Sequence, residues 1–372
     1  MYKFLKTFSY LLVLVCVATS FATVDASQQV LSKLNHFIGQ IESEKVDLQG
    51  GAVAILYKSQ VIYKTTFGKQ KGSIGPVTER TLFPLASVSK PVSAIAIALM
   101  VDQGRLSFDE KFTLPYLKNA VSLTHLLSHT TGYQLRGDIQ IEQGMNRQKL
   151  FNVLNKMQPT SKPGNSYFYS NAIFSMVEEA LNQKELSLEE AIDNLRVCLG
   201  VDEITVLNIN AGQELAYPHS RKIVDGMDVI TALPFPPYYP KTVPAAAGIF
   251  ASLNGMIEIY KLCFGYRPDL ISKSTLKRML TKVRSNHEVF KWRIKWPVDE
   301  KKIESSYALG WRILKVKDRP EKDLIFHSSF INGIRAFIGF IPSDVVGIII
   351  LTNQDTRFPI DTGIALWGEF IN

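Results

Sequence analysis

Ser87 and Lys90 stand three positions apart at the start of a long apolar run. Residues with this spacing share one face of a helix, so a helix beginning here brings the serine hydroxyl and the lysine ammonium together. A serine hydroxyl becomes a good nucleophile when a base removes its proton, and a desolvated lysine is such a base. The partial positive charge of the helix N-terminus would also stabilise an oxyanion. The spacing therefore predicts acyl-transfer chemistry on Ser87.

The same Ser-x-x-Lys spacing arises often by chance, as an N-cap serine followed by an exposed lysine. The flanking residues favour the chemical interpretation instead. Phe-Pro-Leu-Ala leads into Ser87, and the helix that follows is strongly apolar, with Val92, Ile95, Ile97 and Leu99. A lysine in the first turn of a buried helix is costly unless it has a function.

A second candidate is the Tyr-Ser-Asn segment at residues 169–171, which follows a Pro-Gly pair. A tyrosine acts as a base only where nearby cations lower its pKa, and Lys90 would be one such cation for Tyr169. The amide of Asn171 can hold a substrate carbonyl and fix Lys90. A solvent-exposed turn with a packed tyrosine is the alternative interpretation.

The third candidate is His327-Ser328-Ser329, on a predicted strand that precedes a β-rich run over residues 336–342. A strand beside the nucleophile can supply a cation or hydrogen-bond donor, a hydroxyl and a backbone N–H group. By themselves these three residues carry little information.

The elements that must position these residues are strands at both ends of the chain and helices between them. Strand patterns occur at residues 52–57, 61–67, 308–316, 323–328, 333–341 and 346–352. Helical patterns occur at residues 31–44, 87–102 and 361–371. This order predicts an α+β sandwich: an antiparallel sheet from about 27–86 and 300–372, flanked by helices, with a mostly α-helical region inserted over about 87–299.

Residues 1–26 have the features of a signal peptide. Lys3 and Lys6 give a positive start, an apolar stretch covers residues 10–21, and small residues offer cleavage after Ala22 or Ala26. Lipidation at Cys16 and an uncleaved anchor are the alternatives. The sequence predicts an exported protein, periplasmic or secreted.

The composition is that of an ordinary globular protein with a net charge of +8. This charge favours anionic surroundings such as cell-wall polymer or lipid headgroups. No basic helix or aromatic-basic motif accompanies it, so nucleic-acid binding is not expected. Residues 290–296 alternate aromatic or aliphatic side chains with cations, which predicts a half-buried edge strand with a basic outer face; the alternative is a strand that contacts the membrane or cell wall.

Cysteines and histidines give no metal site. Cys198 and Cys263 follow the signal segment and are either paired or two buried thiols. His125 and His129 lack the glutamate of a helical zinc motif and are interpreted as structural. Phosphate loops, dinucleotide fingerprints and Gly-x-Ser-x-Gly are absent from the sequence, so we expect no cofactor and no ordinary α/β-hydrolase.

Together the three candidates resemble the motifs of the serine β-lactamase and penicillin-binding protein superfamily, specifically its class C β-lactamase and DD-peptidase branch. Residues 87–90 match its Ser-x-x-Lys, residues 169–171 its Tyr-x-Asn, and residues 327–329 take the place of its Lys/His-Thr/Ser-Gly strand. Further family-like stretches lie at residues 125–132, 244–248, 307–311 and 351–353. The resemblance implies that residues 27–372 form a β-lactamase-related serine hydrolase domain.

The resemblance also implies roles for these residues. Ser87 would be acylated, with Lys90 and Tyr169 as the general base pair. Asn171 would position Lys90 and substrate. Implied substrates are β-lactams, D-Ala peptides or related amides, either as small molecules or in peptidoglycan-like polymers.

On the strand, His327 and Ser328 would bind a substrate carboxylate or assist the proton relay. The backbone N–H groups of Ser87 and Phe330 would form the oxyanion hole. Ser329 stands where the family has glycine, and its side chain is expected to crowd the gap between strand and nucleophile. Two alternatives follow: an esterase or D-amino-acid peptidase with the same site, and a binding protein whose catalysis Ser329 impairs.

Overall fold

The computed structural model describes residues 27–206, 212–235 and 238–371. Residues 27–44 form a helix, which confirms the helical pattern at residues 31–44. This helix belongs to a different compact unit from residues 48–372. The predicted signal segment lies outside the described residues. None of the described helices combines the length and hydropathy needed to span a bilayer.

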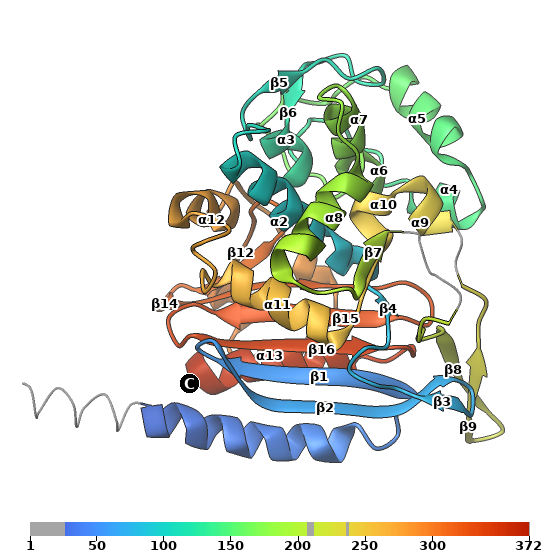
Figure 1. Cartoon of the computed structure of the whole chain (residues 1–372), viewed down its shortest axis with the longest axis vertical. Coiled ribbons are helices and arrows are strands. Elements are labelled where there is room, and N and C mark those ends of the chain that lie inside the picture. Colours follow the sequence, from blue (N-terminus) through green and yellow to red (C-terminus); the bar gives the residue numbers. More distant parts are fainter. Residues whose placement is uncertain (1–26, 207–211, 236–237, 372) are drawn as a thin grey trace, which may run out of the picture. The chain divides into compact units, whose positions relative to one another are not determined.

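The frame of the molecule is an antiparallel sheet built from both ends of the chain (Figure 1). Its described strands are β1 (Gly50–Tyr57), β2 (Gln60–Lys71), β3 (Ile74–Pro76), β11 (Arg284–Ser285), β12 (Ile303–Tyr307), β13 (Arg312–Val316), β14 (Arg319–Ser328), β15 (Arg335–Ile341) and β16 (Val346–Thr352). Their order is β11-β12-β13-β14-β15-β16-β1-β2-β3. The C-terminal β16 therefore pairs with the N-terminal β1, as predicted.

Helices and short strands make up the rest. The helices are η1 (Ala86–Val88), α2 (Ser89–Asp102), α3 (Leu123–Leu127), α4 (Asp138–Glu142), α5 (Arg147–Lys156), α6 (Asn171–Phe174), α7 (Val177–Asn182), α8 (Leu188–Leu199), α9 (Tyr238–Thr242), α10 (Pro244–Ala247), α11 (Leu253–Cys263), α12 (Lys273–Leu280), η2 (Glu288–Lys291), η3 (Glu300–Lys302) and α13 (Phe358–Ile371). The short strands are β4 (Phe83–Pro84), β5 (Lys111–Phe112), β6 (Val121–Ser122), β7 (Ile204–Val206), β8 (His219–Val224), β9 (Met227–Ala232) and β10 (Ile249–Ala251).

Helices cover both faces of the sheet. Side chains alternate along β15, so its residues contact helices on both sides. Phe337 points to α13, where it leaves room only for the hydrogen of Gly363. Phe340 lies three positions later and packs against Tyr260 and Phe264, on or next to α11. Helix α2, which is buried along nearly its whole length, belongs to the same hydrophobic core as Phe340. The site lies where this helix begins.

Gly310 allows the sheet to approach α2 closely. It has φ 78°, and a Cβ atom there would lie 2.8 Å from both the Lys90 carbonyl oxygen and the Ala94 Cβ atom. Its N–H donates to the Leu127 carbonyl oxygen at 2.9 Å. Only glycine fits this turn, which leads from β12 into β13 and so places Arg312 beside the start of α2.

The structure corrects three sequence expectations. Residues 290–296 do not form an edge strand: they leave η2 and continue as irregular chain, because Arg293 has a positive φ of 54° that an extended strand cannot contain. Residues 308–311 form a turn instead of the beginning of a strand. The inserted region also contains short strands, including the exposed β8–β9 hairpin, in which the sequence had few strand signals.

Candidate active site

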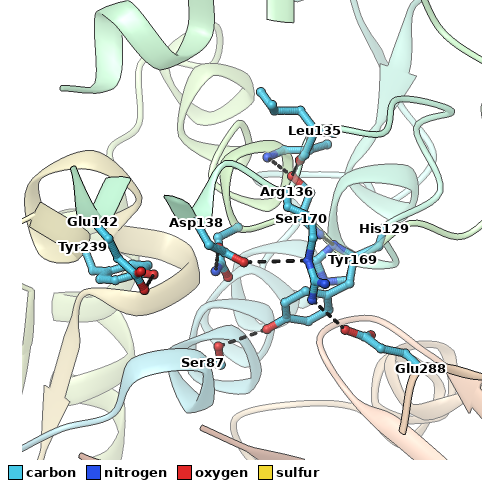
Figure 2. Close-up of polar contacts among 12 residues, drawn as sticks. Ser87, His129, Leu135, Arg136, Asp138, Glu142, Tyr169, Ser170, Tyr239 and Glu288 are labelled. Carbon is cyan, nitrogen blue, oxygen red and sulfur yellow. Dashed lines mark hydrogen bonds and ion pairs between the residues drawn. The ribbon is translucent and has the colours of Figure 1, made fainter. Parts of the chain in front are cut away.

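Ser87 lies in η1, immediately before α2, on the wall of a cavity of about 760 Å³. The residue before it, Ala86, has φ 47°, so the chain turns sharply at the nucleophile. The Ser87 Oγ atom lies 3.0 Å from the Tyr169 hydroxyl and 3.3 Å from Lys90 Nζ. The structure therefore brings together the three groups that the sequence predicted to converge, and Figure 2 shows Ser87 and Tyr169 facing each other.

Lys90 is completely buried and has three polar neighbours. Besides Ser87, its Nζ atom lies 2.6 Å from Asn171 Oδ1 and 3.0 Å from the Ala246 carbonyl oxygen. Burial lowers the pKa of Lys90 well below its ordinary value; the Asp138 carboxylate opposes this shift. The neutral amine has two N–H donors and one lone pair. Because both donors are used by pure acceptors, the lone pair is left for the Ser87 hydroxyl.

Tyr169 has the opposite response to the same environment. Burial raises the pKa of its phenol, so the hydroxyl keeps its proton at neutral pH and donates a hydrogen bond to Ser87 Oγ. The tyrosine ring packs 4.4 Å from the ring of His129 and lies under the guanidinium of Arg312. In this arrangement Lys90 is the stronger candidate for the base, and Tyr169 for the proton donor.

The chain around residues 169–171 is held by side-chain contacts. Ser170 caps α6 and donates its hydroxyl to the Leu135 carbonyl oxygen. Its backbone N–H donates to His129 Nδ1 at 3.2 Å, and the fully buried His129 ring has a pKa well below the ordinary value because of that burial. These contacts agree with the structural interpretation of His129 and fix the place from which Tyr169 and Asn171 project.

His327 does not line the cavity. It is fully buried, its Nε2 atom lies 3.1 Å from the Tyr307 hydroxyl, and its Nδ1 atom lies 2.9 Å from the Ser328 carbonyl oxygen. Burial lowers the pKa of His327 well below its usual value, and the charges of Arg312 and Lys90 act in the same direction. The histidine is therefore neutral at pH 7, and this placement does not match direct contact with a substrate carboxylate.

Arg312, and not His327, is the buried cation beside Tyr169. Its guanidinium lies 4.9 Å from the centre of the Tyr169 ring and forms an ion pair of 3.1 Å with Glu288. Although burial opposes its charge, the Glu288 carboxylate holds the pKa of Arg312 above the usual value. Arg312 was not predicted from the sequence, although it directly follows the family-like stretch at residues 307–311.

Ser328, Ser329 and Phe330 line the cavity opposite the nucleophile helix. The Ser329 side chain is engaged within its own sheet, since its Oγ atom accepts a hydrogen bond of 2.7 Å from the Ala336 N–H. Ser87 and Phe330 both line the cavity. That their backbone N–H groups form an oxyanion hole stays a prediction.

Asp138 and Glu142, one helical turn apart on α4, also line the cavity and were not anticipated from the sequence. Asp138 Oδ1 accepts a hydrogen bond of 2.7 Å from Asn171 Nδ2, and Glu142 accepts one of 2.9 Å from the Tyr239 hydroxyl. Figure 2 shows the two carboxylates on neighbouring parts of the wall near Ser87. Both come from a segment without a recognisable spacing signal.

Cys198 and Cys263 are free thiols in the structure, half-buried and buried respectively. His125 accepts from the Ser122 N–H at 3.0 Å and so closes the first turn of α3. The two cysteines are therefore unpaired in the structure, and His125 has a capping contact.

The fold and the site together define a serine hydrolase of the β-lactamase and penicillin-binding protein superfamily. Residues 38–366 match the model of the family Beta-lactamase, and the chain belongs to that family. A beta-lactamase of Escherichia coli (strain K12) is 23% identical over 92% of this chain and 94% of its own length. The esterase EstB of Burkholderia gladioli is 37% identical over a shorter stretch, 22% of this chain and 24% of its own.

Solved structures show the same fold at low identity. A penicillin-binding protein homologue from Pyrococcus abyssi, described as octameric, superposes with a TM-score of 0.70 at 20% identity, covering 92% of this chain and 76% of its own. A class C beta lactamase superposes with a TM-score of 0.67 at 21% identity, covering 93% and 98% of the two chains.

Proposed function

We propose that the protein is an exported serine hydrolase that is acylated on Ser87 by β-lactams, D-Ala peptides or related amides. The observation that carries the proposal is the contact of Ser87 Oγ with both Lys90 Nζ at 3.3 Å and the Tyr169 hydroxyl at 3.0 Å, at the wall of one cavity. A nucleophile in reach of a base, with the base held by further groups, is the arrangement that acyl transfer requires.

In the proposed reaction, the Ser87 hydroxyl gives its proton to the Lys90 amine as Oγ bonds to the substrate carbonyl carbon. The carbonyl oxygen takes the negative charge and is stabilised by the backbone N–H groups of Ser87 and Phe330. When the carbonyl re-forms, the bond to the leaving group breaks, and the leaving atom takes the proton held by Lys90 and Tyr169. Water then attacks the acyl-enzyme by the reverse proton route and restores Ser87.

Labelling by a fluorescent penicillin tests this proposal. We expect a covalent label on the purified protein that is lost in Ser87→Ala, with mass spectrometry locating the adduct on the peptide that contains Ser87. Absence of any label at high probe concentration would contradict the β-lactam and D-Ala-peptide specificity.

An esterase is the second candidate, and the placement of His327 favours it. A neutral, buried histidine supplies no charge at this position of β14 for the carboxylate of a β-lactam or peptide, so such a carboxylate would have to pair with an arginine of the cavity wall such as Arg312 or Arg335. The local sequence similarity to the esterase EstB also supports this function. Hydrolysis of short p-nitrophenyl esters without penicillin labelling would select this function, and failure to cleave such esters would remove it.

Ser329→Gly tests the third alternative, an impaired binding protein. The Ser329 hydroxyl accepts a hydrogen bond from the Ala336 N–H within its own sheet. We therefore expect the acylation rate of the variant to stay within about threefold of the wild-type rate. A large gain in rate would show that Ser329 obstructs the reaction. If a fluorophosphonate phosphonylates neither the wild type nor the variant, binding without catalysis is favoured.

We also propose that residues 1–26 direct export, so that the substrate is met in the periplasm or outside the cell, beside cell-wall polymer or membrane. The positive start and apolar stretch of that segment support this. N-terminal sequencing of the protein recovered from the periplasm or medium would find residue 23 or 27 first; recovery of full-length chain from the cytoplasm would contradict it.

A further inference from the structure

Asp138 is connected to Lys90 and Ser87 through the side chain of Asn171. It is the first residue of α4, and the chain enters it through Gly137, whose φ of 79° places the carboxylate toward α6. Its Oδ1 atom accepts a hydrogen bond of 2.7 Å from Asn171 Nδ2, while Oδ1 of the same amide lies 2.6 Å from Lys90 Nζ. Asp138, Asn171 and Lys90 thus form an unbroken chain that ends at Ser87.

The chemistry of the carboxylate determines how this chain is oriented. An ionised carboxylate only accepts hydrogen bonds, so Asn171 must present its NH₂ group to Asp138 and its oxygen to Lys90. A flipped amide would set two acceptors against each other at Asp138 and would direct an N–H group at the lysine. The flipped state is therefore disfavoured as long as Asp138 carries its charge.

This orientation matters for the lysine. With Asn171 Oδ1 and the Ala246 carbonyl oxygen accepting its two N–H groups, the lone pair of a neutral Lys90 faces Ser87 Oγ. If the amide flipped, its NH₂ group would compete for that same lone pair. The orientation of one amide thus decides whether Lys90 can accept the serine proton.

We infer that Asp138 is a positioning residue for acylation: through Asn171 it keeps the Lys90 amine oriented to accept the proton of Ser87. This inference rests on the proposed function, in which Lys90 is the base. It follows the general rule that a catalytic base is itself oriented by a third group.

Charges around Asp138 support this role. The carboxylate faces Arg136, whose Nε atom lies 3.8 Å away, and it also interacts with Lys90 and Glu142. Burial raises the pKa of Asp138, whereas the Asn171 hydrogen bond and the Lys90 charge oppose that rise. In return the Asp138 charge raises the pKa of Lys90. Figure 2 shows Asp138 between the Glu142–Tyr239 pair and Tyr169, with Arg136 reaching from it toward Glu288.

The first experiment measures Lys90 directly, without substrate. The protein is labelled with lysine carrying ¹³C at the ε carbon, the Lys90 signal is assigned by its absence in Lys90→Met, and its titration is followed by NMR. In Asp138→Asn we expect the Lys90 midpoint to move to lower pH, because a neighbouring negative charge is lost. An unmoved midpoint would overturn the inference. Asp138→Ser removes the same carboxylate with a smaller side chain and replaces Asp138→Asn if that variant does not fold.

The second experiment follows phosphonylation of Ser87 by a fluorophosphonate from pH 5 to pH 9; in this reaction Oγ bonds to phosphorus and fluoride leaves. For Asp138→Asn we expect a plateau rate lower by on the order of 100-fold, from misorientation of the base, together with an acid limb displaced to lower pH. A purely structural role would lower the plateau and leave the limb in place, and that result would overturn the inference.

Glu142→Gln is the matched control, because Glu142 is the other carboxylate of α4 on the same wall but is bonded to Tyr239 instead of Asn171. We expect it to leave the midpoint of the acid limb unmoved. If wild-type Ser87 reacts with no acyl or phosphonyl probe, the proposed function fails, whereas the NMR titration still decides whether Asp138 acts on Lys90.

Discussion

Lys90 and Tyr169 both contact Ser87 Oγ, and they also lie against each other. Burial nevertheless shifts the pKa values of the two groups in opposite directions. Removing a lysine from water disfavours its cation, and removing a tyrosine from water disfavours its anion. The pKa of Lys90 is accordingly lowered and that of Tyr169 raised. Burial thus favours the neutral form of both groups at the nucleophile, the amine with a lone pair and the phenol with a proton to donate.

This division predicts different effects of removing each group. In Lys90→Met we expect acylation of Ser87 to fall by roughly 100- to 10,000-fold, because the base is lost, and the acid limb of the pH profile to vanish. In Tyr169→Phe the rate should fall but the acid limb should persist, since the base is still present. Stopped-flow measurement of ester acylation against pH checks both. A limb that disappears only in Tyr169→Phe would reverse the assignment.

His327 leads to a second prediction about pH. Between pH 6.5 and pH 8 a histidine with a strongly lowered pKa stays neutral, so it contributes no titration there. The acylation profile of His327→Gln should therefore have the same shape as that of the wild type in this interval, even if its height changes through loss of the Tyr307 contact. A fall in wild-type rate with rising pH that is absent from the variant would instead support a histidine cation.

At this scale the sequence predicted the reacting groups and missed those that govern them. Ser87, Lys90 and Asn171 are recognisable because their neighbours in the chain are restricted by a helix start or a tight segment. Arg312 and Asp138 reach the site from the end of a turn and from a five-residue helix. Such positions depend on packing between distant segments, which one sequence does not reveal.

Among the elements, the contact between the β12–β13 turn and α2 is the most sensitive to a single atom. Gly310→Ala would add a Cβ atom at 2.8 Å from two atoms of α2, in a left-handed conformation. We expect a loss of about 2–4 kcal/mol in the free energy of unfolding, from strain and overpacking together. Gly104→Ala is the control, since Gly104 has φ 73° but open space around it, and should lose only about 1 kcal/mol. Equal losses in urea denaturation would contradict the close-contact argument.

Glu178 on α7 predicts how stability depends on pH. It forms an ion pair with Arg147 and accepts a hydrogen bond from the Ala245 N–H on α10, and it interacts with Glu189 and Glu179. Burial raises the pKa of Glu178 from 4.5 to about 7. The protonated form is therefore favoured by folding, so its contribution is fully present below pH 4.5 and is lost as pH rises through 7.

Compared with wild type, Glu178→Gln should become progressively more stable between pH 5 and pH 8, by up to about 3 kcal/mol. Denaturation with urea at several pH values measures the difference. Glu179→Gln keeps Glu178 but removes a neighbouring charge that raises the pKa of Glu178, so it should reproduce only part of this trend. A constant difference between Glu178→Gln and wild type across this range would refute the assignment.

The element patterns succeeded where burial is uniform and failed where it is mixed. The continuous apolar run at residues 346–352 forms β16, which is buried along its whole length. Residues 290–296 alternate in the sequence without forming a strand. The Trp292 ring stacks on Arg312, and the positive φ at Arg293 interrupts any strand. Alternation alone does not distinguish a strand from irregular chain whose apolar side chains turn inward.

For the whole molecule, the arrangement of the sheet makes its two ends interdependent. β16 pairs with β1 on one side and with β15 on the other. A chain that ends after residue 344 would expose the edges of both neighbours and lose α13, so we expect no cooperative unfolding transition by circular dichroism. Replacing residues 222–229 by a short glycine linker is the control, because β8 and β9 form a separate two-stranded sheet. A cooperative melt of the truncated chain would contradict this prediction.

The place of β16 has a consequence for how the protein acquires its structure during synthesis. β16, which pairs with β1, is made after β1, β2 and β3 and after the whole inserted region, so these three strands lack that partner until β16 has been synthesised. Until then the nucleophile helix has no sheet to rest on. The site around Ser87 can therefore form only after β16 has been made.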